Sequence, residues 1–148
     1  MNTHPYLRAY MAGIVVPTAG LLFILSAFVT LRLVLQFPAP IERAIAFPMA
    51  IVPNLWGVWN MLYVRVRQSR PWKIGIHGLL LPVILGPLGF LLGRALGVME
   101  MTSQGLVYFG EIRLDYAHWV TGIWIGLAFY YLMWKYVVNA LNEVLGIA

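Results

Sequence analysis

Four long stretches without a charged side chain constrain this chain more than any other feature of its sequence. No Lys, Arg, Asp or Glu occurs in residues 9–31, 44–64, 74–93 or 116–134. A helix needs about 20 apolar residues, at a rise of about 1.5 Å each, to cross the ~30 Å hydrocarbon core of a bilayer. Each stretch is therefore long enough for one crossing. The run of leucines at 79–81 does not alternate apolar with polar residues, which argues against an outer-membrane barrel.

Composition supports the same class of protein. Of the 148 residues, 61% are hydrophobic and 10% are charged, whereas a soluble domain is about half apolar and about a quarter charged. The sequence therefore predicts an all-α, polytopic integral membrane protein, in which residues 1–148 form a single four-transmembrane-helix bundle. A short basic loop at 65–73 and a longer loop at 94–115 join the crossings, and an extension at 135–148 follows the last one.

The basic loop predicts the orientation. Arg65, Arg67, Arg70 and Lys73 place four cations within nine residues, with no acid among them. Positive charge is retained on the cytoplasmic side of a membrane, so this loop and both termini are expected inside, in a bacterial-type inner membrane. The same four cations are predicted to bind anionic lipid headgroups. Nucleic acid is not expected as a partner, because long apolar spans interrupt the positive charge.

Matched proline pairs distinguish the second and third crossings. Pro48 and Pro53 lie in one, and Pro82 and Pro87 lie in the other, at nearly equal depth. Each proline removes a backbone hydrogen bond, so both helices are predicted to be interrupted there. Interrupted helices mark the binding site in many transporters, and Asn54 beside them needs polar partners. The alternative is that these are ordinary membrane-helix prolines without a site.

Aromatic side chains occur at unusual depths in the same region. Trp56, Asn60 and Tyr63 follow helical spacing on one face of the second crossing, and Trp124 lies near the middle of the fourth. Such a wall suits a flat apolar ligand such as a quinone, a pigment or a lipid tail, although packing or lipid-facing aromatics give the same pattern. The predicted mid-membrane ligand site consists of Asn54, Trp56, Asn60, Pro53, Pro82 and Trp124.

Glycines recur every four residues in the third and fourth crossings. Gly89, Gly93 and Gly97 form one set, and Gly122 and Gly126 form the other. Small residues let membrane helices approach closely. We therefore predict helix packing at these positions, either within one chain or between the copies of a homo-oligomer.

The stretch at 110–119 carries the best candidate for interfacial chemistry. If the fourth helix begins early, Glu111, Asp115 and His118 share one helix face, and the Asp115–His118 spacing suits a metal site or an oriented general base. These three residues are the catalytic candidates, and Glu100 joins them as a fourth candidate metal ligand. The alternative is a solvated strand, because residues 111–115 also alternate polar with apolar.

The histidines argue against haem. His77 and His118 are predicted at opposite faces of the membrane, roughly 20 Å apart, so an intramolecular bis-histidine haem is disfavoured and any other cofactor is undetermined. The chain has no cysteine, which excludes thiolate ligands. The spans hold no Asp, Glu, Lys or Arg to couple ions, which disfavours proton-coupled export.

The extension at 135–148 is predicted to be an amphipathic helix that protrudes into the cytoplasm or lies against a partner subunit. Asn139, Asn142 and Glu143 fall on its polar faces. Its apolar face is predicted to hold Tyr136, Val137, Leu141, Val144 and Leu145.

Together these features predict a small, non-enzymatic inner-membrane protein that binds or passively passes an apolar or weakly polar ligand. The first alternative is a membrane enzyme or metal site at the outer interface, using Asp115 and His118. The second is an accessory subunit of a larger membrane complex.

Overall fold

The computed structural model describes residues 4–36, 47–69, 72–110 and 112–147, with only the backbone of 47–50. Most of these residues are helical, which confirms the predicted helical class. The elements, in chain order, are α1 (Pro5–Val29), π-helix η1 (Thr30–Val34), α2 (Phe47–Val66), α3 (Ile74–Ala95), β1 (Met99–Thr102), β2 (Gly105–Tyr108), β3 (Ile112–Asp115), α4 (Tyr116–Leu132), π-helix η3 (Met133–Val138) and α5 (Asn139–Val144).

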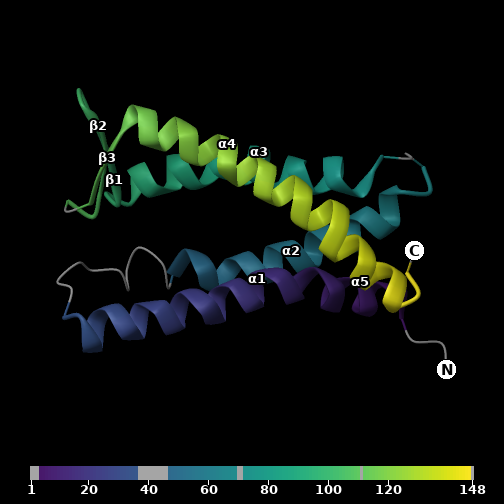
Figure 1. Cartoon of the computed structure of the whole chain (residues 1–148). Coiled ribbons are helices and arrows are strands. Elements are labelled where there is room, and N and C mark those ends of the chain that lie inside the picture. The colour runs from purple at the N-terminus through teal and green to yellow at the C-terminus, as the bar shows by residue number, and fades with distance from the viewer. Residues whose placement is uncertain (1–3, 37–46, 70–71, 111, 148) are drawn as a thin grey trace.

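Two helical hairpins form the molecule. The α1–α2 hairpin and the α3–α4 hairpin lie close together at the end that carries both termini, and they diverge toward the end that carries the strands (Figure 1). A Cβ atom on Gly13 would lie 2.6 Å from the carbonyl oxygen of Trp56 and 2.9 Å from the Cα of Gly57. The backbones of α1 and α2 therefore touch at this point, which only glycine allows.

The second close contact joins α3 to η3. A Cβ atom on Gly78 would lie 2.0 Å from the Trp134 ring, and one on Gly75 would lie 2.9 Å from the Tyr131 ring. Trp134 of η3 fills the space beside Gly78, and Tyr131 of α4 fills the space beside Gly75. Trp134 is completely buried as a result.

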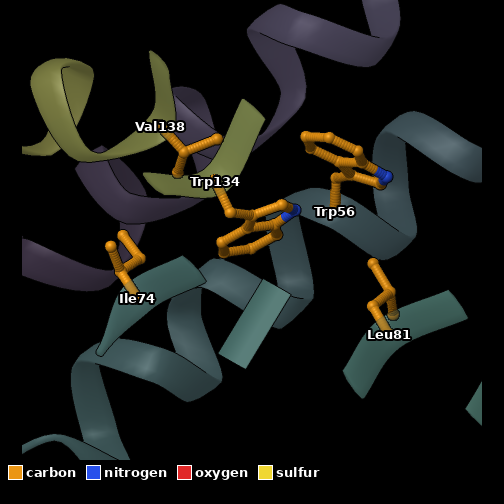
Figure 2. Packing of buried hydrophobic residues seen from close by; sticks show 5 residues of the cluster. All are labelled: Trp56, Ile74, Leu81, Trp134 and Val138. Atoms are coloured by element: carbon orange, nitrogen blue, oxygen red, sulfur yellow. The ribbon is translucent and has the colours of Figure 1, made fainter. Parts of the chain in front are cut away.

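The largest buried cluster lies where the hairpins meet. It contains Trp56 of α2, Ile74 and Leu81 of α3, and Trp134 and Val138 of η3 (Figure 2). The ring centroids of Trp56 and Trp134 are 5.4 Å apart, within the range of favourable aromatic contacts. Tryptophan packing thus holds the two hairpins together at one end.

A buried amide pair fastens the C-terminal extension to the same end. The side chains of Asn60 and Asn142 donate to each other at 2.8 and 3.1 Å, and Asn60 also donates to the carbonyl of Ala9 at 2.8 Å. Ile147 is buried against α1. The extension therefore folds back onto α1 of its own chain instead of protruding.

The predicted apolar face of this extension is right only in part. Leu141 and Leu145 are partly buried and pack against the cluster that contains Ile147. Tyr136 and Val144 are instead 58% and 82% exposed, and the fully buried positions are Val138, Asn142 and Ile147. Asn142 lies inside because its side-chain amide forms hydrogen bonds with the amide of Asn60. Hydropathy alone cannot predict such a pairing.

The prolines do not interrupt their helices. α2 continues through Pro53, and α3 continues through Pro82 and Pro87. This corrects the predicted breaks. A proline removes one helical hydrogen bond, but the following turns keep theirs, and membrane helices commonly tolerate this loss.

Among the described residues, a Cβ atom on four of the five glycines predicted to pack helices would meet nothing within 4 Å: Gly89, Gly97, Gly122 and Gly126. Gly93 faces the side chain of Met99. The reason is that all faces of these helices are apolar, so spacing does not reveal which face meets a neighbour. A contact between two copies of the chain stays a prediction.

A three-stranded antiparallel sheet in the order β1-β2-β3 connects α3 to α4. The strand alternative for residues 104–115 is therefore the one adopted. Leu106 of the central strand is 1% exposed, and Asp115 at the end of β3 leads directly into α4.

Within the described part of the chain, two helices are long and apolar enough to cross a membrane: Pro5–Val34, which combines α1 and η1, and Ile74–Ala95, which is α3. Only 6% and 28% of their most apolar windows are buried inside the protein. Asparagine and aromatic side chains in α2 and α4 lower the mean hydropathy of those helices. The two apolar helices favour a membrane-associated protein and do not by themselves establish four crossings.

Candidate functional site

A cavity of about 430 Å³, which we name the loop-end pocket, lies between the end of α2 and the start of α3. Most of its wall is apolar or aromatic. A concave apolar space with a few polar groups is the usual form of a small-molecule site. The pocket is lined by Trp59, Leu62, Arg65, Val66, Ser69, Trp72, His77 and Leu80.

His77 and Trp59 hold each other in place in this wall. The indole Nε1–H of Trp59 donates to the carbonyl of His77 at 2.8 Å, and Nε2 of His77 lies 3.1 Å from the carbonyl oxygen of Trp59. Because a carbonyl oxygen only accepts, we assign a proton to Nε2, which leaves an acceptor lone pair on Nδ1 of the neutral ring. The two rings stack with centroids 4.9 Å apart. The imidazole is thus fixed in orientation.

Two further polar side chains reach the pocket from the basic end. Arg65 lies in the last turn of α2, and no acidic side chain of the described residues pairs with it. Ser69 is exposed in the following turn, and its backbone N–H bonds to Val66 at 2.9 Å. Arg67 and Lys73 lie in the same loop, and Arg70 is outside the described residues. The pocket therefore combines an apolar interior with a cation and a hydroxyl at its rim.

This combination suits an amphipathic molecule better than a purely apolar one. Arginine recognises carboxylate and phosphate through planar charge-assisted hydrogen bonds, while Leu62, Val66 and Leu80 offer only apolar contact. The sequence interpretation named Arg65 as a headgroup ligand but missed the pocket beside it. The sequence did contain one indication of the pocket, because Trp59 and His77 both lie within about two helical turns of the basic loop.

Two members of the predicted mid-membrane site belong to the core. Trp56 and Asn60 are 2% and 0% exposed. The Tyr130 ring lies 4.9 Å from Trp56, and Asn60 pairs with Asn142, so the protein's own side chains occupy this face. The buried indole N–H groups of Trp56 and Trp134 lack an acceptor among the described residues, which costs roughly 1–3 kcal/mol each.

The other four members are separated from these two. Asn54 is exposed and accepts a hydrogen bond from the hydroxyl of Tyr10. Pro53 and Pro82 are half-buried within continuous helices, and Trp124 is 68% exposed on α4. The structure does not gather the six predicted residues around one space. Trp56 packs in the core, as the packing alternative has it, and Trp124 lies on the exposed surface of α4.

The predicted Asp115–His118 pair is present at the opposite end of the molecule. Asp115 caps α4: its Oδ1 accepts the backbone N–H of His118 at 2.7 Å, and its Oδ2 lies 2.6 Å from Nδ1 of His118. These hydrogen bonds, from the backbone first and the ring second, hold the pKa of Asp115 below its usual value. Both side chains are exposed, at 54% and 78%. The carboxylate therefore orients an imidazole that faces solvent.

The wider metal site is not formed by the residues that the structure describes. Glu111 lies outside them, and Ile112–Asp115 is a strand, so Asp115 and His118 are not part of one helix face that extends back toward residue 111. Within the described ranges no three His, Asp or Glu residues lie close enough to hold a metal ion. Glu100 in β1 therefore does not join the pair. His77 and His118 lie in the first turns of antiparallel helices, at opposite ends of one hairpin.

Comparison with known proteins adds no relative: no family model, no curated protein and no solved structure matches this chain.

Proposed function

We propose that this chain is a four-span integral membrane protein that binds an amphipathic ligand in the loop-end pocket without transforming it. The ligand is lipid-like, quinone-like or pigment-like, with an apolar body and a polar end. The crossings are residues 9–31, 44–64, 74–93 and 116–134. Because positive charge is retained inside, the basic loop and both termini face the cytoplasm of a bacterial-type cell.

Exposed apolar side chains support the membrane part of this proposal. Phe23 of α1 is 75% exposed, Leu91 of α3 is 62% exposed and Ile125 of α4 is 65% exposed. None of the residues of α4 is buried. Extended apolar surface is rare on soluble monomers, whereas lipid tails solvate it as well as another leucine does.

The single observation that carries the ligand proposal is the loop-end pocket itself. Its volume of about 430 Å³ lies within the usual range of roughly 300–1,000 Å³ for small-molecule sites. In a four-span arrangement it lies at the cytoplasmic interface, where an amphipathic molecule already resides. The predicted site thus moves from the bilayer centre to the inner surface, because tryptophan and asparagine side chains fill the centre.

A matched pair of substitutions in α3 tests the proposal. Leu80 lines the pocket, whereas Leu88 is 57% exposed two turns further along the same helix. Leu80→Trp fills the pocket, and Leu88→Trp adds the same side chain elsewhere. Native mass spectrometry of each protein, extracted from cell membranes in mild detergent, reports bound small molecules directly.

We expect the unmodified protein and Leu88→Trp to carry the same added mass, and Leu80→Trp to have lost it. Retention of that mass by Leu80→Trp would place the ligand elsewhere and overturn the proposal. So would an unmodified protein that stays free of small molecules after incubation with a lipid extract.

A second candidate function is supported by one observation, the 2.6 Å contact between Asp115 and His118. A carboxylate that orients Nδ1 leaves Nε2 of the imidazole exposed as a general base, which suits a membrane enzyme acting on lipid or quinone-like substrates at the outer interface. The test is turnover of a lipid and quinone extract by the purified protein and by His118→Gln. If the two reaction mixtures keep the same composition over time, this second candidate function is excluded.

The remaining proposal concerns the chains with which this protein associates. Open space beside Gly89, Gly122 and Gly126 supports a homo-oligomer, or an accessory role in which another chain covers this face. The same native spectra report copy number. A strictly monomeric protein without companions would contradict both arrangements.

A further inference from the structure

We infer that the loop-end pocket selects an anionic phospholipid whose headgroup carries a free hydroxyl. This rests on the proposed function and specifies the polar end of the ligand. Three polar side chains at the pocket, those of Arg65, Ser69 and His77, define the chemistry, and each makes a different demand on the headgroup.

Arg65 demands a negative charge. Arg65 lines the pocket and is exposed, it has no acidic partner among the described residues, and its guanidinium stays charged at any physiological pH. Arginine matches the oxygen geometry of phosphate with two parallel hydrogen bonds. Ser69 adds a hydroxyl donor on the same rim. A phosphodiester, which bears one negative charge and several acceptor oxygens, meets both side chains.

His77 demands a hydrogen-bond donor. Its Nε2 is committed to the carbonyl of Trp59 at 3.1 Å, so Nδ1 of the neutral ring is an acceptor. The ring lines the pocket, and stacking on Trp59 prevents it from turning away. A phosphate without protons offers nothing to this lone pair, whereas a headgroup hydroxyl does. The ligand therefore needs a hydroxyl beyond the phosphodiester.

The rest of the wall accounts for the lipid part. Leu62, Val66 and Leu80 supply apolar contact inside the pocket, and Leu62 is itself 38% exposed, so its side chain belongs both to the pocket wall and to the apolar outer surface of α2. The headgroup and the first carbons occupy the pocket, and the acyl chains leave along that surface into the bilayer. A free phosphate ion would leave this apolar wall without a partner.

The experiment uses the full-length protein in neutral detergent and measures apparent Kd by native mass spectrometry for four probes. Phosphatidylglycerol has the anionic phosphodiester and free hydroxyls. Phosphatidylmethanol has the same charge and no hydroxyl. Phosphatidylcholine has no net charge, and inorganic phosphate has no lipid part.

We expect phosphatidylglycerol to bind at least about ten-fold more tightly than phosphatidylcholine, and about three- to ten-fold more tightly than phosphatidylmethanol. Inorganic phosphate should not compete at millimolar concentration. Equal affinity for the two anionic lipids, equal affinity for phosphatidylcholine, or competition by phosphate would each overturn the inference.

Three variants locate the effect. Arg65→Gln should weaken phosphatidylglycerol binding about ten-fold or more, while Arg67→Gln removes an equal charge outside the pocket and should change it less than two-fold. His77→Gln keeps a donor to the Trp59 carbonyl but has no acceptor at the position of Nδ1, so it should abolish the preference for phosphatidylglycerol over phosphatidylmethanol. Equal losses in the two arginine variants, or an unchanged preference in His77→Gln, would contradict the assignment.

The failure of this inference is distinguishable from failure of the proposed function. Suppose that Leu80→Trp abolishes the binding of every lipid while the affinity depends neither on the headgroup nor on Arg65. In that case the pocket binds amphiphiles without selecting an anionic hydroxylated headgroup. If Leu80→Trp changes no affinity, the ligand does not use the pocket at all.

Discussion

The buried amide pair between Asn60 and Asn142 permits a sharp test of the packing at the end where the termini meet. Replacing Asn60 with leucine, which has a similar shape, removes three hydrogen bonds: two donated by its Nδ2 and one accepted by its Oδ1. It also leaves the amide of Asn142, which is 2% exposed, without its partner. The carbonyl of Ala9 keeps its helical bond, so the penalty falls on Asn142.

The magnitude follows from these three bonds. Hydrogen bonds contribute about 0.5–1.5 kcal/mol each in water and about 0.6 kcal/mol on average between membrane helices. Asn60→Leu should therefore lower the free energy of unfolding by about 2–4 kcal/mol. Asn142→Leu should cost less, about 1–2 kcal/mol, because Asn60 still donates to Ala9. The double substitution replaces both amides with apolar groups and should lie close to the more stable single variant.

The assay is reversible unfolding in mixed detergent micelles, followed by tryptophan fluorescence and arranged as a double-mutant cycle. Because the double variant should be about as stable as Asn142→Leu, the expected coupling between the two positions equals the loss in Asn60→Leu, about 2–4 kcal/mol. Asn139→Leu is the matched control: this amide donates to Glu143 on the exposed side of the same helix, so its loss should change stability by less than about 0.5 kcal/mol. Additive losses in the double variant, within about 0.5 kcal/mol, would refute the paired arrangement.

Two further predictions concern α3 and the start of α4. Gly78→Ala should destabilise the protein by about 1–3 kcal/mol because the new methyl group overlaps the Trp134 ring. Gly86 has open space beside it, so Gly86→Ala should be neutral or stabilising in the same unfolding assay. Equal effects of the two substitutions would contradict the contact between Gly78 and Trp134. The pKa of Asp115 is lowered by hydrogen bonds from His118, so its contribution to stability is present above about pH 4 and is lost as the pH falls through the lowered pKa. In Asp115→Asn, the melting temperature should fall less steeply as the pH is lowered through the acid range. An unchanged dependence of the melting temperature on acid pH would contradict this.

Much of the helical architecture was predictable because charge is costly in hydrocarbon. The uncharged stretch 74–93 nearly coincides with α3 at Ile74–Ala95, and the stretch 116–134 begins where α4 begins, at Tyr116. The boundaries follow from charged residues and need no knowledge of packing. The alternation of residues 111–115 likewise identified β3.

The arrangement of faces was not predictable in the same way. Gly78 packs against Trp134 and Gly89 packs against nothing within the chain, yet both are glycines in the same uniformly apolar helix. Without a polar face, hydropathy does not distinguish the side of a helix that meets a neighbour from the side that meets lipid.

The candidate site was only partly predictable for a related reason. The basic loop drew attention to Arg65, which lines the loop-end pocket, but a pocket wall made by Trp59 and His77 depends on how two helices are placed side by side. Asn60 illustrates the opposite error. Its helical spacing with Trp56 and Tyr63 suggested a ligand contact, whereas its side-chain partner in the structure, Asn142, is 82 residues away in the sequence.

The most direct test of the account is the sidedness of its two connecting regions. Because the chain has no cysteine, Ser69→Cys in the basic loop and Ser103→Cys between β1 and β2 each introduce a unique thiol at an exposed position. Labelling of intact cells with a membrane-impermeant maleimide should modify Ser103→Cys at once and Ser69→Cys only after the membrane is permeabilised. Labelling of both thiols from the same side would contradict the four-span arrangement and the interfacial pocket that depends on it.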